Sequence, residues 1–174
     1  FNSFMNQILI VPNSFLRKKT KEVESVNARE LDISKKMIDI MLAAPGVGLA
    51  ANQIGIEKSI VTINFHDEKK KKSKIYALFN PVITKYSKEK VLMEEGCLSI
   101  PKQFAEIERP ESIELKYRDE KNNIIVENKK GYEARILQHE IDHLSGKLFI
   151  DYLSPLKRNM IIKKVKKLHK LGKI

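Results

Sequence analysis

The sequence predicts a single α+β domain over residues 1–174, with mostly antiparallel sheets packed around a central helix that carries an HExxH motif. Three observations support this prediction. The chain is long enough for one hydrophobic core, and 42% of its residues are hydrophobic. Short β-type runs fill the middle of the chain, and helical periodicity is found near each end and around the motif. No internal repeat or proline-rich linker divides the chain, so one domain is expected.

An N-terminal helix is predicted over residues 27–43. Asn27 followed by Glu30 resembles a capping box, which marks a helix start. Apolar residues recur inside this segment at helical spacing, namely Leu31, Ile38, Met41 and Leu42. The next segment, GVGLAANQIG at residues 46–55, has three glycines and no periodicity. It predicts a loop whose backbone can approach a ligand closely.

Short β-type runs follow, and turn residues between them favour antiparallel pairing. The predicted strands are residues 59–64, 75–79, 82–86, 91–94, 112–117 and 124–127. Residues 119–123, DEKNN, have turn chemistry and predict a hairpin between the last two strands. Residues 66–74, HDEKKKKSK, are predicted to form a solvated loop. A further short strand is expected at residues 147–150.

The central helix is predicted over residues 132–144. Ile136, His139, Glu140 and His143 share one side of it, and Leu137, Ile141 and Leu144 supply apolar packing beside them. Ser145 and Gly146 end the helix, because glycine commonly follows a helix C-terminus.

A basic C-terminal helix is predicted over residues 154–173, with Ser154 as its cap and Pro155 at its first position. An apolar stripe is expected along it, formed by Leu156, Met160, Val165, Leu168 and Leu171. Residues 155–174 contain eight basic residues and no acid, out of a net charge of +11 for the chain. The charge is therefore concentrated on one helix face.

Composition limits the class of protein. The single cysteine, Cys97, excludes an intrachain disulfide and suits a reducing compartment. The sequence contains no run of 18 apolar residues, and its N-terminus lacks the zones of a secretory signal. We therefore expect a soluble protein without a membrane span. Residues 1–4 precede Met5 and are expected to be a tag remnant or a processed end.

The segment QHEIDH predicts a metal site. His139 and His143 are four residues apart, so their imidazoles stand one above the other on a helix and can bind one ion. Glu140 lies beside them, where a carboxylate can take a proton from metal-bound water. The alternative is that the histidines only pack or face solvent, which the rarity of the pattern disfavours. A hydrolytic site of this kind needs a third protein ligand.

Three sources of the third ligand were compared. An HExxHxxGxxH site would need a histidine where this chain has Phe149. An acid on a later helix is a poor option, because Asp151 is the only acid after His143. Cys97, in the segment EEGCLSIP, remains. A lone cysteine is more often a small buried hydrophobic residue, but its thiolate is a good ligand for zinc or ferrous iron. Cys97 is therefore the predicted third ligand.

Three segments together, GVGLAANQIG, EGCLSIP and QHEIDHLSGKLFIDYL, closely resemble the three sequence motifs of peptide deformylases in their order and spacing. The resemblance extends to Pro12, to Leu16 and Arg17, and to Arg109 and Pro110, so it covers most of the chain. Asn52 is a departure, because many members of the family carry proline or threonine at this position.

The resemblance implies a catalytic centre and a reaction. The implied metal ligands are Cys97, His139 and His143. Metal-bound water would attack the formyl group of an N-formylmethionyl peptide and release formate, with Glu140 as general base and then general acid. The side-chain amide of Gln53 and the backbone N–H of Leu98 would stabilise the negative charge on the carbonyl oxygen.

The resemblance also implies how a substrate binds. Val47, Gly48 and Leu49 would pair with an extended peptide through main-chain hydrogen bonds, and Gly96 would contribute to the same surface. An apolar pocket for methionine would include Val47 and Ile136. Ferrous iron is the implied metal, although two imidazoles and a thiolate also suit Zn²⁺, Ni²⁺ or Co²⁺. We expect a monomer in the bacterial cytoplasm, with an organelle form as the alternative.

The basic C-terminal helix has two interpretations of equal weight. It would offer Lys163, Lys164, Lys166, Lys167 and Lys170 to the phosphates of ribosomal RNA, or it would simply be a solvated face. Two other functions stay open for the chain as a whole. One is an HExxH-type metallopeptidase with a third ligand other than Cys97. The other is a non-catalytic RNA- or ribosome-binding domain with a vestigial site.

Overall fold

The computed structural model describes residues 7–174 and confirms the predicted α+β class. The tag remnant or processed end expected at residues 1–4 lies outside the described residues. The helices are α2 (Ala28–Ala43), α3 (Gly131–Leu144) and α4 (Pro155–Lys170). Short 3-10 helices are η1 (Ser14–Arg17), η2 (Ala51–Ile54) and η3 (Phe149–Tyr152).

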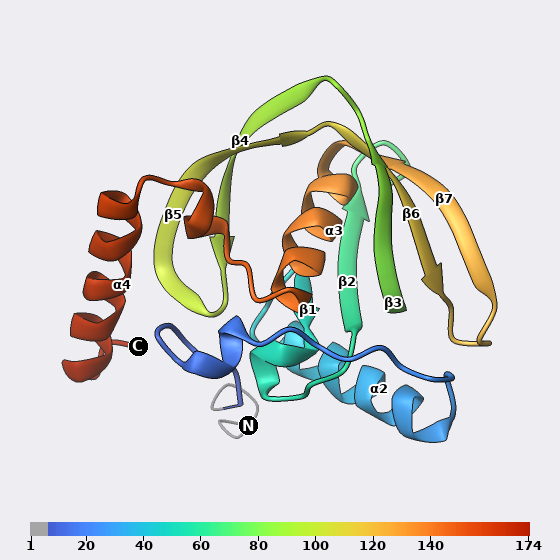
Figure 1. The fold of residues 1–174 in the computed structure, drawn as a ribbon, viewed down its shortest axis with the longest axis horizontal. Helices are drawn as coiled ribbons and strands as arrows, with labels where there is room; N and C mark the ends of the chain where they lie inside the picture. The colour runs from blue at the N-terminus through green and yellow to red at the C-terminus, as the bar shows by residue number, and fades with distance from the viewer. Residues whose placement is uncertain (1–6) are drawn as a thin grey trace.

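The strands form two antiparallel sheets. Five strands have the order β1-β2-β3-β6-β7, and β4 pairs with β5 in a separate sheet. The helix α3 runs between the two sheets (Figure 1). The bounds of the strands are β1 (Gly48–Ala50), β2 (Ile60–Asp67), β3 (Lys72–Tyr86), β4 (Lys90–Cys97), β5 (Ile100–Pro110), β6 (Ser112–Arg118) and β7 (Ile124–Lys130).

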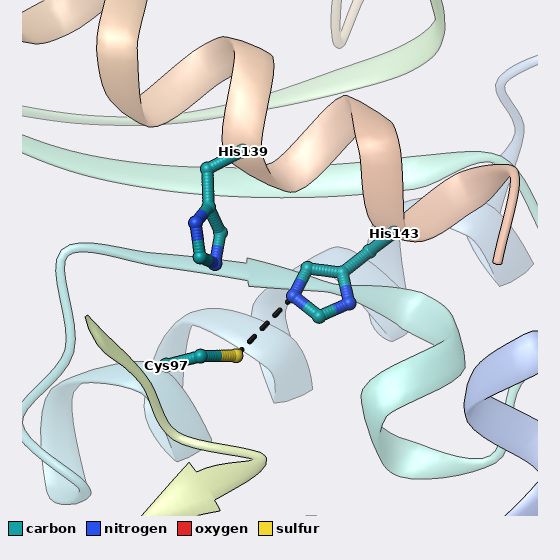
Figure 2. Close-up of side chains that lie close together, drawn as sticks. All are labelled: Cys97, His139 and His143. Atoms are coloured by element: carbon teal, nitrogen blue, oxygen red, sulfur yellow. Dashed lines mark hydrogen bonds between the residues drawn. The ribbon is translucent and has the colours of Figure 1, made fainter. Parts of the chain in front are cut away.

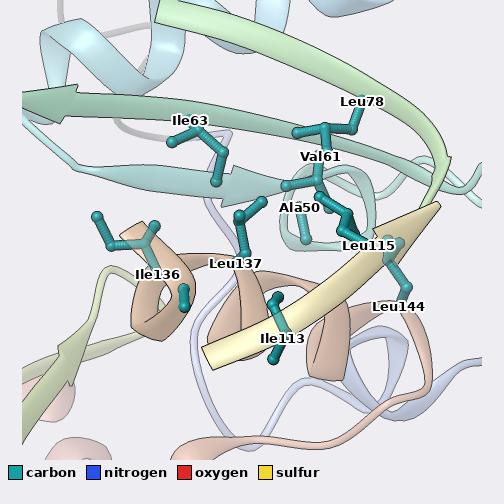
Figure 3. Packing of buried hydrophobic residues seen from close by; sticks show 10 residues of the cluster. Ala50, Val61, Ile63, Leu78, Ile113, Leu115, Ile136, Leu137 and Leu144 are labelled. Atoms are coloured by element: carbon teal, nitrogen blue, oxygen red, sulfur yellow. The ribbon is translucent and has the colours of Figure 1, made fainter. Parts of the chain in front are cut away.

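A buried apolar cluster holds α3 against the five-stranded sheet (Figure 3). Leu137 and Leu144 of α3 belong to this cluster together with Val61 and Ile63 of β2. The alternate residue Ile60 belongs to a second cluster, which includes the buried side of α2. Because successive side chains of a strand point to opposite faces, β2 is buried by α3 on one face and by α2 on the other.

The helix α2 begins where it was predicted, but the capping box is wrong. The Asn27 side chain accepts a hydrogen bond from the backbone N–H of Arg29 at 3.1 Å. A capping box would need the Asn27 side chain to accept from the Glu30 N–H instead. The Glu30 carboxylate is buried and accepts a hydrogen bond from Lys58 at 3.2 Å, because the packing of α2 turns Glu30 toward the segment that leads into β2. Leu42, expected in the apolar stripe, is 42% exposed.

The strands differ from the prediction in two places near β3. The predicted strands at residues 75–79 and 82–86 are one continuous strand, with a register shift between Phe79 and Val82. Asn80 lies at this shift with a φ of 52°, so one residue in a left-handed conformation absorbs the irregularity. The solvated loop predicted at residues 66–74 is shorter than expected, because the pairing between β2 and β3 extends into both ends of this segment.

β5 was not predicted, although it pairs with β4 along its length. Its sequence, IPKQFAEIERP, alternates buried and exposed positions, and the exposed positions include charged residues. The strand predicted at residues 147–150 is wrong, since this segment leads into η3. Asp151 explains the difference, because its carboxylate accepts from the Leu148 N–H at 3.0 Å and pairs with Arg17 at 2.6 Å. The chain therefore turns where a strand would continue.

The helix α4 begins as predicted, with the Ser154 side chain accepting from the Lys157 N–H at 3.2 Å. Its apolar stripe was predicted on the wrong face except for Val165, which is buried in a third cluster with β5 and η3. Ile161 and Ile162 pack against that cluster, and three residues of the predicted stripe are more than half exposed, namely Leu156, Met160 and Leu171. None of the helices within residues 7–174 is long and apolar enough to span a membrane.

Candidate metal centre

Two elements bring the predicted metal ligands together (Figure 2). His139 and His143 lie about one turn apart on α3, and Cys97 is the last residue of β4. The Sγ atom of Cys97 lies 3.3 Å from Nε2 of His143. One ligand atom from each of the three side chains lies within 4.8 Å of the other two. The side chains thus converge from a strand end and a helix that are far apart in the sequence.

This group of side chains fits a divalent metal ion. In a tetrahedral site with nitrogen and sulfur ligands, the ligand atoms are about 3.5 Å apart. The observed spread of at most 4.8 Å needs only small rotations to reach that geometry. Burial lowers the pKa of His143 well below its ordinary value, and nearby His139 and Arg109 lower it further. The ring is therefore neutral, which is the form that binds a metal.

Glu95 orients the ring of His139 through Nδ1, the ring nitrogen that does not face the other two predicted ligands. Its Oε1 lies 2.8 Å from Nδ1 of His139, and its two oxygens accept from Arg109 at 2.6 and 3.0 Å. Arg135 donates to the same carboxylate at 2.7 Å. Burial raises the pKa of Glu95, but the bonds from His139 and Arg109 outweigh it and hold the pKa at about 2. Because Nδ1 faces Glu95, Nε2 is the nitrogen of His139 that can bind a metal. Burial lowers the pKa of His139, but Glu140, Cys97 and Glu95 together raise it well above its ordinary value, so a metal at Nε2 would displace a proton.

Further contacts connect this carboxylate to the rest of the fold. Arg109 on β5 also donates to Asp142 of α3 at 2.8 Å and to the Tyr152 hydroxyl of η3 at 3.3 Å. The Tyr152 hydroxyl donates to Asp142 at 2.7 Å. Sequence reasoning missed the roles of Glu95 and Arg135, and it named Arg109 only as part of the family resemblance. The only signal was that Glu95 stands two residues before Cys97, on the same face of a strand.

Glu140 lies beside the predicted ligands with 4% of its surface exposed. Its Oε1 is 3.9 Å from Nε2 of His143 and has no hydrogen-bond partner among residues 7–174. Gly48 makes room for it, because a Cβ at that position would lie 2.8 Å from Cδ of Glu140. Burial raises the pKa of Glu140 to about 7, although His139 opposes the shift. A carboxyl group with this pKa can both accept and donate a proton near neutral pH.

The side-chain amide of Gln53 is held in one orientation by hydrogen bonds at both of its ends. Its Oε1 accepts from the backbone N–H of Ala50 at 2.9 Å. Its Nε2 donates to Oγ of Ser99 at 3.0 Å and lies 3.5 Å from Sγ of Cys97. Because the carbonyl end is occupied by a backbone donor, the N–H end of the amide must face the metal centre.

Asn52, the departure from the family pattern, is fully buried next to Gln53. Its Nδ2 donates to the backbone carbonyl of His143, and the same atom is 3.5 Å from the carbonyl of Lys18. The side chain therefore connects η2 to the end of α3 that carries a predicted ligand. No catalytic group is lost by this substitution.

A cavity of about 720 Å³ opens over the metal centre. The predicted site residues that line it are Val47, Gly48, Gln53, Gly96, Cys97, Leu98, His139 and Glu140. Leu49 and Ile136 do not line it, because their side chains are buried in the two clusters that flank the five-stranded sheet. The predicted contact of Ile136 with the methionine side chain is therefore not supported, whereas the main-chain pairing predicted for Leu49 does not depend on its side chain. Sequence reasoning missed other lining residues, including Ile8, Ile10, Lys102, Phe104, Lys173 and Ile174.

Comparisons with known proteins identify the family. A family model described as polypeptide deformylase matches residues 5–159. A peptide deformylase of Pelagibacter ubique is 46% identical over 164 residues, which are 94% of this chain and 95% of that protein. The crystal structure of peptide deformylase from Ehrlichia chaffeensis has a TM-score of 0.91 at 39% identity, covering 97% of this chain and 98% of that one. A structure of the Ehrlichia chaffeensis protein in complex with actinonin has a TM-score of 0.87 at 41% identity, over 92% and 95% of the chains. The chain therefore belongs to the polypeptide deformylase family of metal-dependent hydrolases.

Proposed function

We propose that this chain removes the N-formyl group from the N-terminal formylmethionine of newly made polypeptides and releases formate. The observation that carries the proposal is the placement of Glu140 against Gly48, beside three convergent metal-ligand side chains and inside a cavity. The names of the relatives support the same reaction. The Ehrlichia chaffeensis relative that binds actinonin shows that a fold of this kind can hold a small molecule.

The metal would be held by Cys97, His139 and His143. A divalent ion bound there would act as a Lewis acid, polarising the formyl carbonyl and making water a better nucleophile near neutral pH. We propose ferrous iron as the native metal by family resemblance, with Zn²⁺, Ni²⁺ or Co²⁺ able to replace it in a purified sample. Glu95 supports this role by fixing the orientation of His139.

Glu140 moves the proton. Its carboxylate accepts a proton from the attacking water and then donates it to the departing amine. Confinement against Gly48 keeps this carboxylate close to the reacting atoms. One residue thus serves both proton transfers without leaving its place.

Two donors would stabilise the negative charge that develops on the carbonyl oxygen. The side-chain amide of Gln53 is oriented before a substrate arrives, because its carbonyl end accepts from the Ala50 N–H. The backbone N–H of Leu98 follows Cys97 directly and is the second proposed donor. Donors that are already oriented need no reorganisation in the transition state.

The peptide would lie along β1, which is an edge strand of the five-stranded sheet. Main-chain groups of Val47 and Gly48 would pair with it, and Leu49 would contribute only through its backbone. Gly96 lines the opposite wall of the cavity. Pairing through the main chain ignores side-chain identity, which suits an enzyme that meets many different nascent sequences. Val47, at 45% exposure, offers apolar surface to the first side chain.

The test is formate release from a formyl-Met-Ala-Ser peptide by anaerobically purified, metal-loaded protein. Replacing Glu140 with alanine should reduce the rate about 10²–10⁴-fold while one equivalent of metal stays bound. Preserved turnover in this variant would rule out the base role. Cleavage between amino acids without formate release would instead support a metallopeptidase.

We also propose that α4 contacts the phosphates of ribosomal RNA. The predicted lysines of α4 are exposed and form no ion pair with a carboxylate in the described part of the chain, namely Lys163, Lys164, Lys166, Lys167 and Lys170. Four of them, Lys163, Lys164, Lys167 and Lys170, match in number the exposed run Lys69–Lys72 elsewhere on the surface. Residues 155–174 contain no acid that would weaken their field. Three apolar side chains lie exposed on the same helix and can pack against a docked surface. A solvated face without a partner is the alternative.

Replacing those four lysines with glutamine should weaken binding to purified ribosomes and reduce the salt slope, log Kobs against log salt concentration, by up to about 3. The matched control replaces the exposed run Lys69–Lys72 with glutamine, which removes the same charge elsewhere. Equal affinities and equal slopes for the two variants would contradict the contact.

We propose finally that the chain works as a monomer in the bacterial cytoplasm, where formylated nascent chains are made. Its relatives in Pelagibacter ubique and Agrobacterium fabrum support a bacterial setting. Light scattering after size-exclusion chromatography should give the mass of one chain. A dimer mass at micromolar concentration would contradict the monomer.

A further inference from the structure

The cavity over the metal centre continues to a rim built by two distant segments. Lys102 lies near the start of β5, and Lys173 follows α4. Nζ of Lys102 donates to the backbone carbonyl of Lys173 at 3.0 Å, and this bond closes one side of the cavity. The side chain of the neighbouring Ile174 is half-buried against the third apolar cluster. The segment after α4 is therefore part of the cavity wall.

An aromatic ring lines the same cavity. Phe104 pairs with Gly96 across the β4–β5 ladder. A Cβ at Gly96 would be only 2.6 Å from Cε1 of Phe104, so the ring lies directly on the glycine next to Cys97. Phe104 is nevertheless 63% exposed, and it lines the cavity. An exposed ring in this position offers apolar surface to a peptide that leaves the metal centre.

Two lysine side chains give the rim positive charge. Neither Lys102 nor Lys173 forms an ion pair with a carboxylate within residues 7–174. Among the side chains that line the cavity in the described part of the protein, the only carboxylate is that of Glu140, which is 4% exposed and lies beside the metal ligands. The ammonium groups of Lys102 and Lys173 would therefore attract an anionic group on a bound peptide, and no exposed acidic side chain of the described cavity lining opposes them.

We propose that Lys102 and Lys173, with the ring of Phe104, form a specificity-determining subsite that favours peptides with an acidic side chain downstream of the formylated residue. This inference rests on the proposed function. Attraction between partly exposed charges selects by about 3-fold to 5-fold for each contact, and the preference falls as salt screens it. Because it acts on binding, it lowers KM and leaves kcat nearly unchanged.

The test compares formyl-Met peptides in which one aspartate replaces asparagine at the second, third or fourth position. In the parent protein, kcat/KM should be about 5-fold higher for the peptide with aspartate than for the peptide with asparagine at one of these positions. The difference should lie in KM and not in kcat. Exchanging both rim lysines for glutamate (K102E with K173E) should invert this ratio. The single change Lys173→Glu, which keeps the backbone carbonyl that Lys102 binds, should lower the ratio by a smaller factor. The matched control, Lys69→Glu with Lys70→Glu, should leave the ratio unchanged.

Failure of this inference differs from failure of the proposed function. The subsite would be overturned if the protein releases formate and the ratio of kcat/KM for the aspartate peptide to kcat/KM for the asparagine peptide is the same in the parent and in the K102E/K173E protein. Absence of formate from every peptide would overturn the proposed function. In that case, calorimetric binding of the same peptides to the parent protein tests the rim, and equal affinities for the two peptides would overturn it as well.

Discussion

Two charged networks with similar composition behave differently in this molecule. The inner network is formed by Glu95, Arg109, Arg135, Asp142 and Tyr152. The outer network lies over the five-stranded sheet and is formed by Tyr76, Tyr117, Glu127, Lys129 and Glu133. Both join carboxylates, cations and tyrosine hydroxyls across strands and α3. Only the inner network ends on a predicted metal ligand.

The two networks differ in the burial of one carboxylate in each, Glu95 in the inner network and Glu127 in the outer network. The side chains of Glu95 and Arg109 are 5% and 3% exposed, whereas that of Glu127 is 33% exposed. A buried ion pair that loses one partner leaves a charge without water, which costs about 3–5 kcal/mol. An exposed pair contributes about 0–1 kcal/mol, because water replaces the missing partner. The comparison teaches that the same residue types position a ligand only where water is excluded.

The comparison would be broken most severely by Glu95→Gln. This change keeps the shape of the side chain but leaves Arg109 and Arg135 without their buried counter-charge. We expect a loss of about 3–5 kcal/mol in the free energy of unfolding, measured by urea denaturation. Metal affinity, measured by competition with a chelator, should fall about 10–100-fold because His139 loses its orienting partner. Unchanged metal affinity would show that Glu95 is structural only.

The pH dependence of stability sharpens the comparison. The pKa of Glu95 is about 2 in the folded protein, against 4.5 for an ordinary glutamate. A depressed folded pKa contributes stability that is fully present above pH 4.5 and is lost as pH falls from 4.5 toward 2. The contribution is up to about 3 kcal/mol. Urea denaturation between pH 5 and pH 3 should show a steeper loss for the parent than for Glu95→Gln, and parallel curves would contradict it.

Gly48→Ala tests the carboxylate of Glu140, whose position depends on the space beside Gly48 and not on ion pairs. The added methyl group would meet the carboxyl group of Glu140 and displace it from the metal centre. We expect formate release to fall about 10²-fold, because a displacement of about 1 Å can have that effect. Metal content should not change, since no ligand is touched. Turnover within 3-fold of the parent would mean that Glu140 has room to move.

The smallest effect is expected from Glu127→Gln in the outer network. Lys129 keeps Glu133 at 3.3 Å as a partner, and the Glu127 side chain that is changed is 33% exposed. The free energy of unfolding should change by about 1 kcal/mol or less, and metal affinity should stay the same. This variant is the matched control for Glu95→Gln. A loss comparable to that of the inner network would contradict the assignment of their difference to burial.

The centre of the fold was predictable from the sequence because its signals are local. His139 and His143 are linked by the period of one helix, and Cys97 is the only thiol. The contribution of Glu95 could not be predicted, because it depends on contacts with β5 and α3, 14 and 44 positions away along the chain. A single sequence does not show which buried carboxylate meets which cation.

The same reason explains the errors in secondary structure. β5 was missed because it has charged residues at exposed positions, and only its pairing with β4 makes them the outer face of a strand. The helix α4 has two apolar stripes that compete for burial. Contact with β5 and η3 selects the face with Ile161, Ile162 and Val165, and leaves Met160 exposed. Periodicity alone could not rank these faces.

The central claim is that one thiolate and two imidazoles bind the same ion. X-ray absorption spectroscopy of the zinc-loaded protein tests it most directly. We expect one sulfur scatterer at about 2.3 Å and two nitrogen scatterers at about 2.0–2.1 Å, with the sulfur lost in Cys97→Ala. A metal-loaded parent whose spectrum contains no sulfur in the first coordination shell would contradict the account.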